Sequence, residues 1–328
     1  MKTEKSKEKT NTNYLPDVLG DGFNKLILSL AYDYEGDVVA TLIRRNSKTQ
    51  TGTAILYIHG FNDYFFQEEM AKQFNNQGYN FYALDLRKYG RSHLSHQKLN
   101  NVRSLIEYDE EIDLALQIIK SENNNQVILK GHSTGGLIVT NYAGNHLNNN
   151  LFHGIICNSP FYEFNLNIIE RKIGIPILSM LSTYFPNKLI SSGFSKLYGY
   201  SLHEKKHGEW NYSLTWKPHE IPKVNLGFIS AIYNAQKKIQ NNLIIDVPLL
   251  VMYSNTSIYE NHWSEKFKEG DAVLNANHIR NYARKIEGNV TSFEIKNGMH
   301  DLILSKKPVR ENVYKKMFEW IDIKFKSP

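Results

Sequence analysis

Cysteine is almost missing from this sequence. Cys157 is the only one among 328 residues, so no disulfide bond can form within the chain and no metal site can be built on several thiolates. The residue lies in Gly154–Asn158, an apolar run typical of a buried strand, where cysteine usually acts as a small hydrophobic side chain. These observations exclude a disulfide-stabilised scaffold and a metal site of the cysteine type.

Long apolar runs are missing as well. The longest candidate, Ile173–Leu181, has about half the length of a membrane-spanning helix and follows three charged residues. The N-terminus carries lysines but lacks the apolar stretch of a secretory signal peptide. We therefore expect a cytoplasmic protein without a transmembrane segment, for which transient contact with lipid stays open.

The charge pattern gives no sign of a nucleic-acid partner. The net charge of +6 is spread along the chain rather than gathered in one block. Part of it lies in Met1–Thr10, which is rich in lysine, and we expect residues 1–20 to form a disordered or extended tail. Nucleic-acid binding would require a basic stripe or a recognisable module, and the sequence has neither.

What the sequence does contain is a regular alternation of strand-like and helix-like segments. Lys25–Tyr32 and Val38–Arg44 read as two strands joined by a turn, which predicts an antiparallel N-terminal hairpin. From the apolar run Ala54–Ile58 to Gly154–Cys157, strands alternate with helices, and the alternation resumes at Pro248–Tyr253. This pattern predicts an α/β fold with a mostly parallel central sheet and helices on both faces.

The alternation is interrupted between residues 161 and 245. This stretch is rich in aromatic and apolar residues and contains scattered prolines. We interpret it as a helical insertion into one α/β core, whose first part covers residues 21–160 and whose second part covers residues 246–328.

The most informative motif is Gly131-His132-Ser133-Thr134-Gly135. It follows the strand-like run Val127–Leu129 and precedes the helix-like run Leu137–His146. In this context G-x-S-x-G forms a nucleophile elbow, a sharp turn that exposes the serine hydroxyl at the end of a strand. The following helix directs its free N–H groups toward an oxyanion formed there. Ser133 is therefore the candidate nucleophile.

A serine nucleophile requires a base, an acid and an oxyanion site. His300 is the candidate base, because it follows the last predicted strand at the sheet edge where catalytic groups gather. The acid should lie after the strand Leu249–Tyr253, and we choose Asp271 because it leads directly into the next helix. The other acids in this region are Glu260, Glu265 and Glu269.

The oxyanion site is expected after the strand that ends at Ile58. Gly60 would let the backbone approach the substrate, and the N–H of Phe61 could act together with that of Thr134. His59 in the same loop is expected to be structural. Asp85–Ser92, which follows the next strand, is expected to be a hydrogen-bonded scaffold near the site.

One motif points to a different class of enzyme. His203-Glu204-Lys205-Lys206-His207 matches H-E-x-x-H, which holds zinc when both histidines lie on one face of a stable helix. Glycines lie close on both sides of the motif, and the sequence offers no third ligand. We interpret the match as a coincidence and expect no metal.

Taken together, these motifs resemble those of the α/β-hydrolases, in particular the monoacylglycerol lipase, lysophospholipase and serine-aminopeptidase-like branch. The similarity spans roughly residues 20–325, with the motifs in the family's order. It implies a Ser133–His300–Asp271 triad, an oxyanion hole of the Phe61 and Thr134 amides, no metal or cofactor, and a helical cap over the site. One departure is the stretch Asn255–Glu269, which intervenes before Asp271, so that the acid either follows an inserted loop or is a glutamate within it.

The expected activity is hydrolysis of carboxylic esters through an acyl-enzyme on Ser133, with a small ester or lipid as substrate. Hydrolysis of small esters or peptides, and a catalytically inactive binding protein of the same fold, stay open as alternatives. The acyl chain length and the oligomeric state also stay open. Candidates for the wall of an acyl pocket come from the inserted segment: Ile173, Ile177, Leu181 and Trp210.

Overall fold

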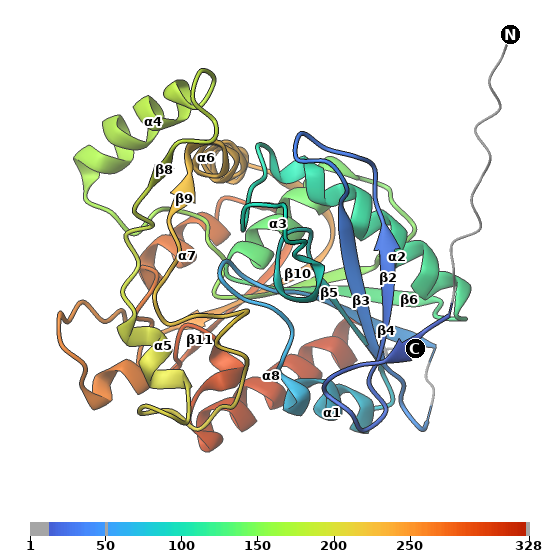
Figure 1. The fold of residues 1–328 in the computed structure, drawn as a ribbon. Helices are drawn as coiled ribbons and strands as arrows, with labels where there is room; N and C mark the ends of the chain where they lie inside the picture. Colours follow the sequence, from blue (N-terminus) through green and yellow to red (C-terminus); the bar gives the residue numbers. More distant parts are fainter. Residues whose placement is uncertain (1–12, 50–51, 326–328) are drawn as a thin grey trace, which may run out of the picture.

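The computed structural model describes residues 13–49 and 52–325, and within them a nine-stranded sheet runs through the centre of the molecule (Figure 1). The strand order is β1-β2-β3-β5-β4-β6-β7-β10-β11. The strands are β1 (Leu15–Pro16), β2 (Asn24–Ser29), β3 (Val39–Arg45), β4 (Thr53–Ile58), β5 (Asn80–Asp85), β6 (Gln126–His132), β7 (Gly154–Asn158), β10 (Ile244–Ser254) and β11 (Glu287–Ile295).

The sheet is antiparallel at its N-terminal edge and parallel elsewhere. β1, β2, β3 and β5 pair antiparallel in that order, whereas β5, β4, β6, β7, β10 and β11 form one parallel block. The predicted mostly parallel sheet with an antiparallel N-terminal hairpin is thus confirmed. All the parallel strands run the same way, so the loops after β4, β6, β10 and β11 meet at one edge.

Helices cover both faces of the sheet, as the fully buried residues of β4 require. Successive side chains of β4 enter opposite cores: Leu56 and Ile58 one, Ile55 and Tyr57 the other. The first core lies beneath α2 (Asp109–Ser121), α3 (Thr134–Asn145) and α7 (Ala276–Ala283), the second beneath α1 (Glu68–Asn76) and α8 (Lys307–Phe325).

The chain between β7 and β10 forms the inserted segment. It contains a π-helical turn (Glu170–Gly174), α4 (Ile175–Leu181), α5 (Leu197–Leu202) and α6 (Leu226–Gln240), with β8 (Leu189–Ile190) pairing β9 (Val224–Asn225). Figure 1 shows α4 and α5 at one side of the sheet, with α6 near α3. The β8–β9 pair was not predicted, because strands of two residues leave no periodic pattern in a sequence.

Ion pairs fix the segments around the sheet edge. The guanidinium of Arg91 donates to both carboxylate oxygens of Asp17 at 2.7 and 2.8 Å, and to Asp85 at 2.8 Å. Asp85 also accepts the backbone N–H of Phe65 at 2.8 Å. Residues 13–20 are therefore attached to the loop after β5, whereas the lysine-rich run Met1–Thr10 lies outside the described residues. Among those described, no helix combines the length and the apolar composition that crossing a bilayer requires.

Candidate active site

Ser133 lies between the last residue of β6 and the first residue of α3, in a backbone conformation that few side chains adopt. Its φ is 53° and its ψ is −117°. Hydrogen bonds hold this conformation: the Ser133 N–H donates to Asn158 O at 3.0 Å, and its carbonyl accepts from Phe161 N at 3.0 Å. Strained residues of this kind gather at functional sites because the surrounding structure must maintain them.

The glycines of the motif make the sharp turn sterically feasible. A Cβ on Gly131 would collide with the backbone of Gly135 and Gly136. A Cβ on Gly135 would collide with the carbonyl oxygens of Ile58, the last residue of β4, and of His59, which follows it. The first turn of α3 can therefore pack directly against β6 and β4 only because these positions lack side chains.

His300 and Asp271 form a buried pair. His300 Nδ1 lies 2.9 Å from Asp271 Oδ2, and both side chains are almost completely buried. The other carboxylate oxygen, Asp271 Oδ1, accepts the N–H groups of Val273 at 2.8 Å and Leu274 at 2.7 Å. The pair occupies Nδ1 of the imidazole and leaves Nε2 as the ring nitrogen that can exchange a proton.

Asp271 reaches this position through a loop that leaves the end of β10 and returns to it. The Asp271 N–H donates to Thr256 O and its carbonyl accepts from Ile258 N, both at 2.8 Å. Residues 259–269 thus form an excursion, a loop whose two ends lie next to each other. The alternative acids lie on this excursion, and each pairs with a lysine instead: Glu260 with Lys266, Glu265 with Lys268 and Glu269 with Lys306.

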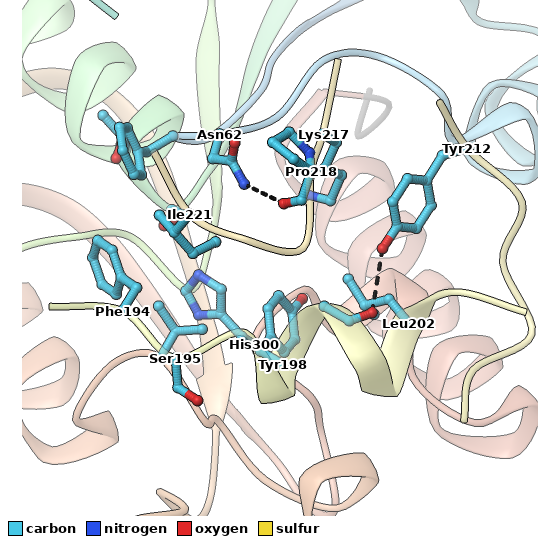
Figure 2. Close-up of a pocket in the computed structure, with 15 residues that line it drawn as sticks. Asn62, Phe194, Ser195, Tyr198, Leu202, Tyr212, Lys217, Pro218, Ile221 and His300 are labelled. Carbon is cyan, nitrogen blue, oxygen red and sulfur yellow. Dashed lines mark hydrogen bonds between the residues drawn. The ribbon is translucent and has the colours of Figure 1, made fainter. Parts of the chain in front are cut away.

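Ser133 and His300 line the same pocket. Figure 2 shows His300 among the residues of its wall. It has about 590 Å³ of empty space, part of it open to solvent. Its wall has an apolar part and a polar part. The apolar residues are Phe61, Phe194, Gly199, Leu202, Pro218, Ile221 and Val273. The polar residues besides Ser133 and His300 are Asn62, Thr134, Ser195, Tyr198, Tyr212 and Lys217.

Two backbone amides predicted to bind an oxyanion belong to residues of this wall. Phe61 and Thr134 both line the pocket, and Thr134 is the first residue of α3. Gly60 lies against Ser133, since a Cβ there would be 3.1 Å from Ser133 Cβ. His59 is held away from this chemistry: its Nε2 accepts the Leu86 N–H at 3.1 Å, and its Nδ1 lies 2.8 Å from Gly60 O.

Charged groups near the pocket are few and mostly compensated. The Lys217 ammonium lies 2.8 Å from the carboxylate of Asp63, which is buried beside the pocket. The ring of His132 lies 4.8 Å from that of His300. Burial holds the pKa of His132 well below the usual value of an imidazole, so this neighbour stays neutral.

The four side chains predicted to line an acyl pocket lie elsewhere. Ile173, in the π-helical turn, is exposed, and so are Ile177 and Leu181 in α4. α4 packs on α6 through other residues, and Ser179 is hydrogen-bonded to Ser230 of α6. The Trp210 indole N–H donates to Leu304 O at 2.9 Å and does not line the pocket of Ser133. The side chains that do line it from the inserted segment lie mainly on α5 and in the loops around it, where short apolar stretches gave no periodic signal.

The H-E-x-x-H motif does not form the helix that a zinc site of this type would require. α5 ends at Leu202, so His203 and His207 do not share a helical face. His203 Nε2 lies 3.2 Å from Tyr212 O, and His207 stacks on Trp263. Within residues 13–49 and 52–325, no three His, Cys, Asp or Glu side chains are grouped as a metal would require.

Solved structures with the same fold include lipases and esterases. The monoglyceride lipase of Saccharomyces cerevisiae, solved as a soluble variant with a substrate analog, is 17% identical, with a TM-score of 0.66 over 97% of this chain and 98% of that chain. The monoacylglycerol lipase of Paleococcus ferrophilus is 16% identical, with a TM-score of 0.62 over 85% and 98%. A thermostable carboxyl esterase of Bacillus coagulans, solved with glycerol, is 12% identical, with a TM-score of 0.62 over 92% and 98%. At these identities the likeness shows the fold alone.

A search of curated protein sequences returned no match. A family model does match, and its description is "Serine aminopeptidase, S33". The match covers residues 49–303, which include the serine motif, the inserted segment, Asp271 and His300. The chain therefore belongs to the serine aminopeptidase S33 family of hydrolases, with the α/β-hydrolase fold that its sheet and motifs predict.

Proposed function

We propose that this protein hydrolyses carboxylic esters through an acyl-enzyme on Ser133. The observation that carries the proposal is the arrangement of three side chains. Ser133 and His300 line one pocket, and the imidazole of His300 is hydrogen-bonded to the buried carboxylate of Asp271. A serine next to a histidine that a carboxylate orients is the arrangement that activates a hydroxyl for acyl transfer.

In the proposed reaction, Ser133 Oγ attacks the ester carbonyl while Nε2 of His300 takes the hydroxyl proton. The same nitrogen then gives the proton to the leaving alcohol, and a water molecule repeats the sequence to release the acid. Asp271 keeps the proton of the neutral imidazole on Nδ1 and stabilises the imidazolium that forms. The Val273 and Leu274 amides hold the carboxylate in place.

The negative charge of the tetrahedral intermediate would be held by the N–H groups of Phe61 and Thr134. Thr134 is at the start of α3, where backbone N–H groups have no partner within the helix and carry partial positive charge. Gly60, which precedes Phe61, lies directly against Ser133. Such fixed donors contribute about 3–4 kcal/mol each to transition-state stabilisation in related chemistry.

We further propose that residues 161–245 form a cap over the pocket and that the substrate is an ester with an apolar acyl group, such as a monoacylglycerol or lysophospholipid. Phe194 and Ile221 come from this segment and form an apolar wall together with Phe61 and Val273. Apolar walls favour an acyl chain because burying each methylene group contributes about 0.8 kcal/mol.

The charge of the pocket argues against an aminopeptidase, despite the description of the family. An aminopeptidase must bind the α-ammonium group of its substrate, which requires an uncompensated carboxylate in the pocket. The residues that line this pocket include Lys217 and neither Asp nor Glu, and the nearby Asp63 is already paired with Lys217. The ammonium group of such a substrate would therefore find no unpaired carboxylate among the lining residues.

The test compares wild-type protein with Ser133→Ala on p-nitrophenyl esters from acetate to dodecanoate and on alanine p-nitroanilide. We expect ester hydrolysis that falls by about 10⁴-fold or more in kcat on removal of the hydroxyl, and no measurable anilide hydrolysis. Ser191→Ala, at an exposed loop position, serves as the control and should retain full activity.

Labelling with a fluorophosphonate separates the remaining alternatives. The wild type should react at Ser133, and Ser133→Ala should not. Wild-type protein that neither reacts nor cleaves esters would refute the proposal in favour of a binding protein with this fold. Efficient cleavage of the anilide would instead identify a peptidase.

A further inference from the structure

The first turn of α5 lies directly against the loop that carries His300. The ring of Tyr198 stands nearly perpendicular to the imidazole, at 80°, with the ring centroids 5.5 Å apart. The Tyr198 hydroxyl accepts the backbone N–H of Asp301 at 3.0 Å. Figure 2 shows the two rings side by side in the wall of the pocket. One side chain of the inserted segment thus contacts both the imidazole and the adjacent peptide.

The backbone N–H of Asp301 has an acceptor of different origin from the acceptors of the neighbouring backbone amides. Most of the neighbouring amides are bound by residues of the core or of the loop itself, namely Met299 N by Ser305 Oγ, Leu302 N by Asn158 Oδ1 and Ile303 N by Asp301 Oδ1. The partner of the amide next to His300 comes instead from the inserted segment. Burial raises the pKa of the Tyr198 hydroxyl well above its usual value, so it stays a neutral acceptor.

The other side of α5 is braced by the excursion that precedes Asp271. The Trp263 indole N–H donates to Ser201 Oγ at 3.0 Å. The Trp263 ring also stacks on His207, just after α5, with the ring centroids 3.5 Å apart. α5 is therefore held between the loop of the histidine and the loop that leads to the carboxylate, and Tyr198 has a fixed support.

We propose that Tyr198 is a positioning residue for His300, so that the inserted segment completes the catalytic arrangement in addition to covering the pocket. The ring limits rotation of the imidazole, and the hydroxyl fixes the peptide that follows it. This inference rests on the proposed function, in which Nε2 of His300 must be aimed at Ser133. Small displacements of a reacting group lower the rate more than they lower substrate binding, because the lost interaction belongs to the transition state.

The kinetic test uses Tyr198→Leu and Tyr198→Phe, with Tyr200→Phe as the matched control. Tyr200 lies two residues further along α5, faces His219 and does not line the pocket. We expect kcat to fall about 100-fold in Tyr198→Leu and about tenfold in Tyr198→Phe, with KM within about threefold of the wild type. Tyr200→Phe should keep both constants. The difference in kcat between Tyr198→Phe and Tyr198→Leu measures how much the aromatic ring contributes without the hydroxyl.

A second readout does not depend on any activity. Exchange of the Asp301 amide proton, followed by mass spectrometry or NMR, should be faster in Tyr198→Phe than in the wild type and in Tyr200→Phe, because that N–H loses its acceptor. The melting temperature of each variant verifies that the fold is retained. If the wild type showed no Ser133-dependent ester hydrolysis, the proposed function would fail while the exchange measurement still tested the contact.

The outcomes are distinct. A fall in kcat at nearly constant KM, together with faster exchange at Asp301, supports the positioning role. A rise in KM at constant kcat would mean that Tyr198 only contacts substrate, and it would overturn the inference. Unchanged exchange in Tyr198→Phe would overturn it too, whatever the kinetics.

Discussion

Replacing Lys130 by methionine should make the protein more stable at neutral pH. Lys130 lies on β6, three positions before Ser133, and is completely buried. Its ammonium has no hydrogen-bond partner among the described residues and lies 5.2 Å from the ring of Tyr57. Burial lowers the pKa of Lys130 from 10.5 to about 8, against the opposing attraction of Asp301. A buried cation with so few compensating interactions lowers the free energy of unfolding.

The size of this cost follows from the lowered pKa. A tenfold change in proton affinity corresponds to about 1.4 kcal/mol, so a pKa of about 8 in place of 10.5 corresponds to about 3 kcal/mol. Methionine has a similar length and shape without the charge, so it should fill the same space at little strain. We therefore expect Lys130→Met to raise the free energy of unfolding at pH 7 by up to about 3 kcal/mol.

The pH dependence gives the sharper test. Between pH 8 and 10.5 the unfolded chain keeps the Lys130 proton that the folded chain has already released, so wild-type stability rises with pH relative to the variant. The difference in the free energy of unfolding between the two proteins should have its maximum value below pH 8 and should fall toward zero near pH 10.5. Urea unfolding of both proteins at several pH values measures it, and titration of all other groups cancels in the comparison.

Two results would refute this reasoning. One is a variant no more stable than the wild type at pH 7. The other is a difference that stays constant from pH 7 to 10.5, since it could not come from the charge of Lys130. Because Lys130 does not line the pocket, kcat on the best ester should stay within about twofold, which also verifies that the fold is intact.

Further predictions concern the acid and the elbow. Asp271→Asn should lower kcat about 10⁴-fold at nearly constant KM in steady-state assays, because the amide favours the wrong tautomer of the imidazole. Glu265→Gln and Glu269→Gln should change kcat less than about twofold, because each glutamate pairs with a lysine at the surface. A larger loss in either variant would identify that glutamate as the catalytic acid instead of Asp271. Gly135→Ala should abolish soluble expression or lower the melting temperature by many degrees, because the new methyl group meets the carbonyl oxygen of Ile58; a variant with an unchanged melting temperature would contradict the close packing of the elbow.

The core of the fold was predictable because its signals are local. Runs such as Ala54–Ile58 are apolar on both faces, which only a covered strand tolerates, and the observed β4 differs from that run by one residue at its start. The helix after Ser133 was predicted from Leu137 onward but begins at Thr134. Gly135 and Gly136 have low helix propensity, so the sequence does not predict the first turn of this helix. The same glycines allow that turn to pack closely against the sheet.

The inserted segment was predicted only in outline. Its boundaries could be inferred because the strand–helix alternation stops and later resumes. The side chains of this segment that reach the pocket could not be inferred from the sequence. Their identity depends on how α4, α5 and α6 pack, and not on a local sequence pattern. The apolar run Ile173–Leu181 supplied three of the four predicted pocket residues, yet Ile173 and Ile177 are exposed. Tyr198 and Lys217, which do line the pocket, lie in stretches without periodicity.

The excursion at residues 259–269 has a consequence for how such enzymes can diverge. Because Thr256 and Asp271 are joined by a backbone hydrogen bond, the chain between them starts and ends at nearly the same place. Lengthening a loop whose ends are already closed costs little entropy, so insertions or deletions here would leave the carboxylate where it is. The number of residues between strand and acid is then free to drift between related proteins, and a pattern search with fixed spacing would overlook many true counterparts of Asp271.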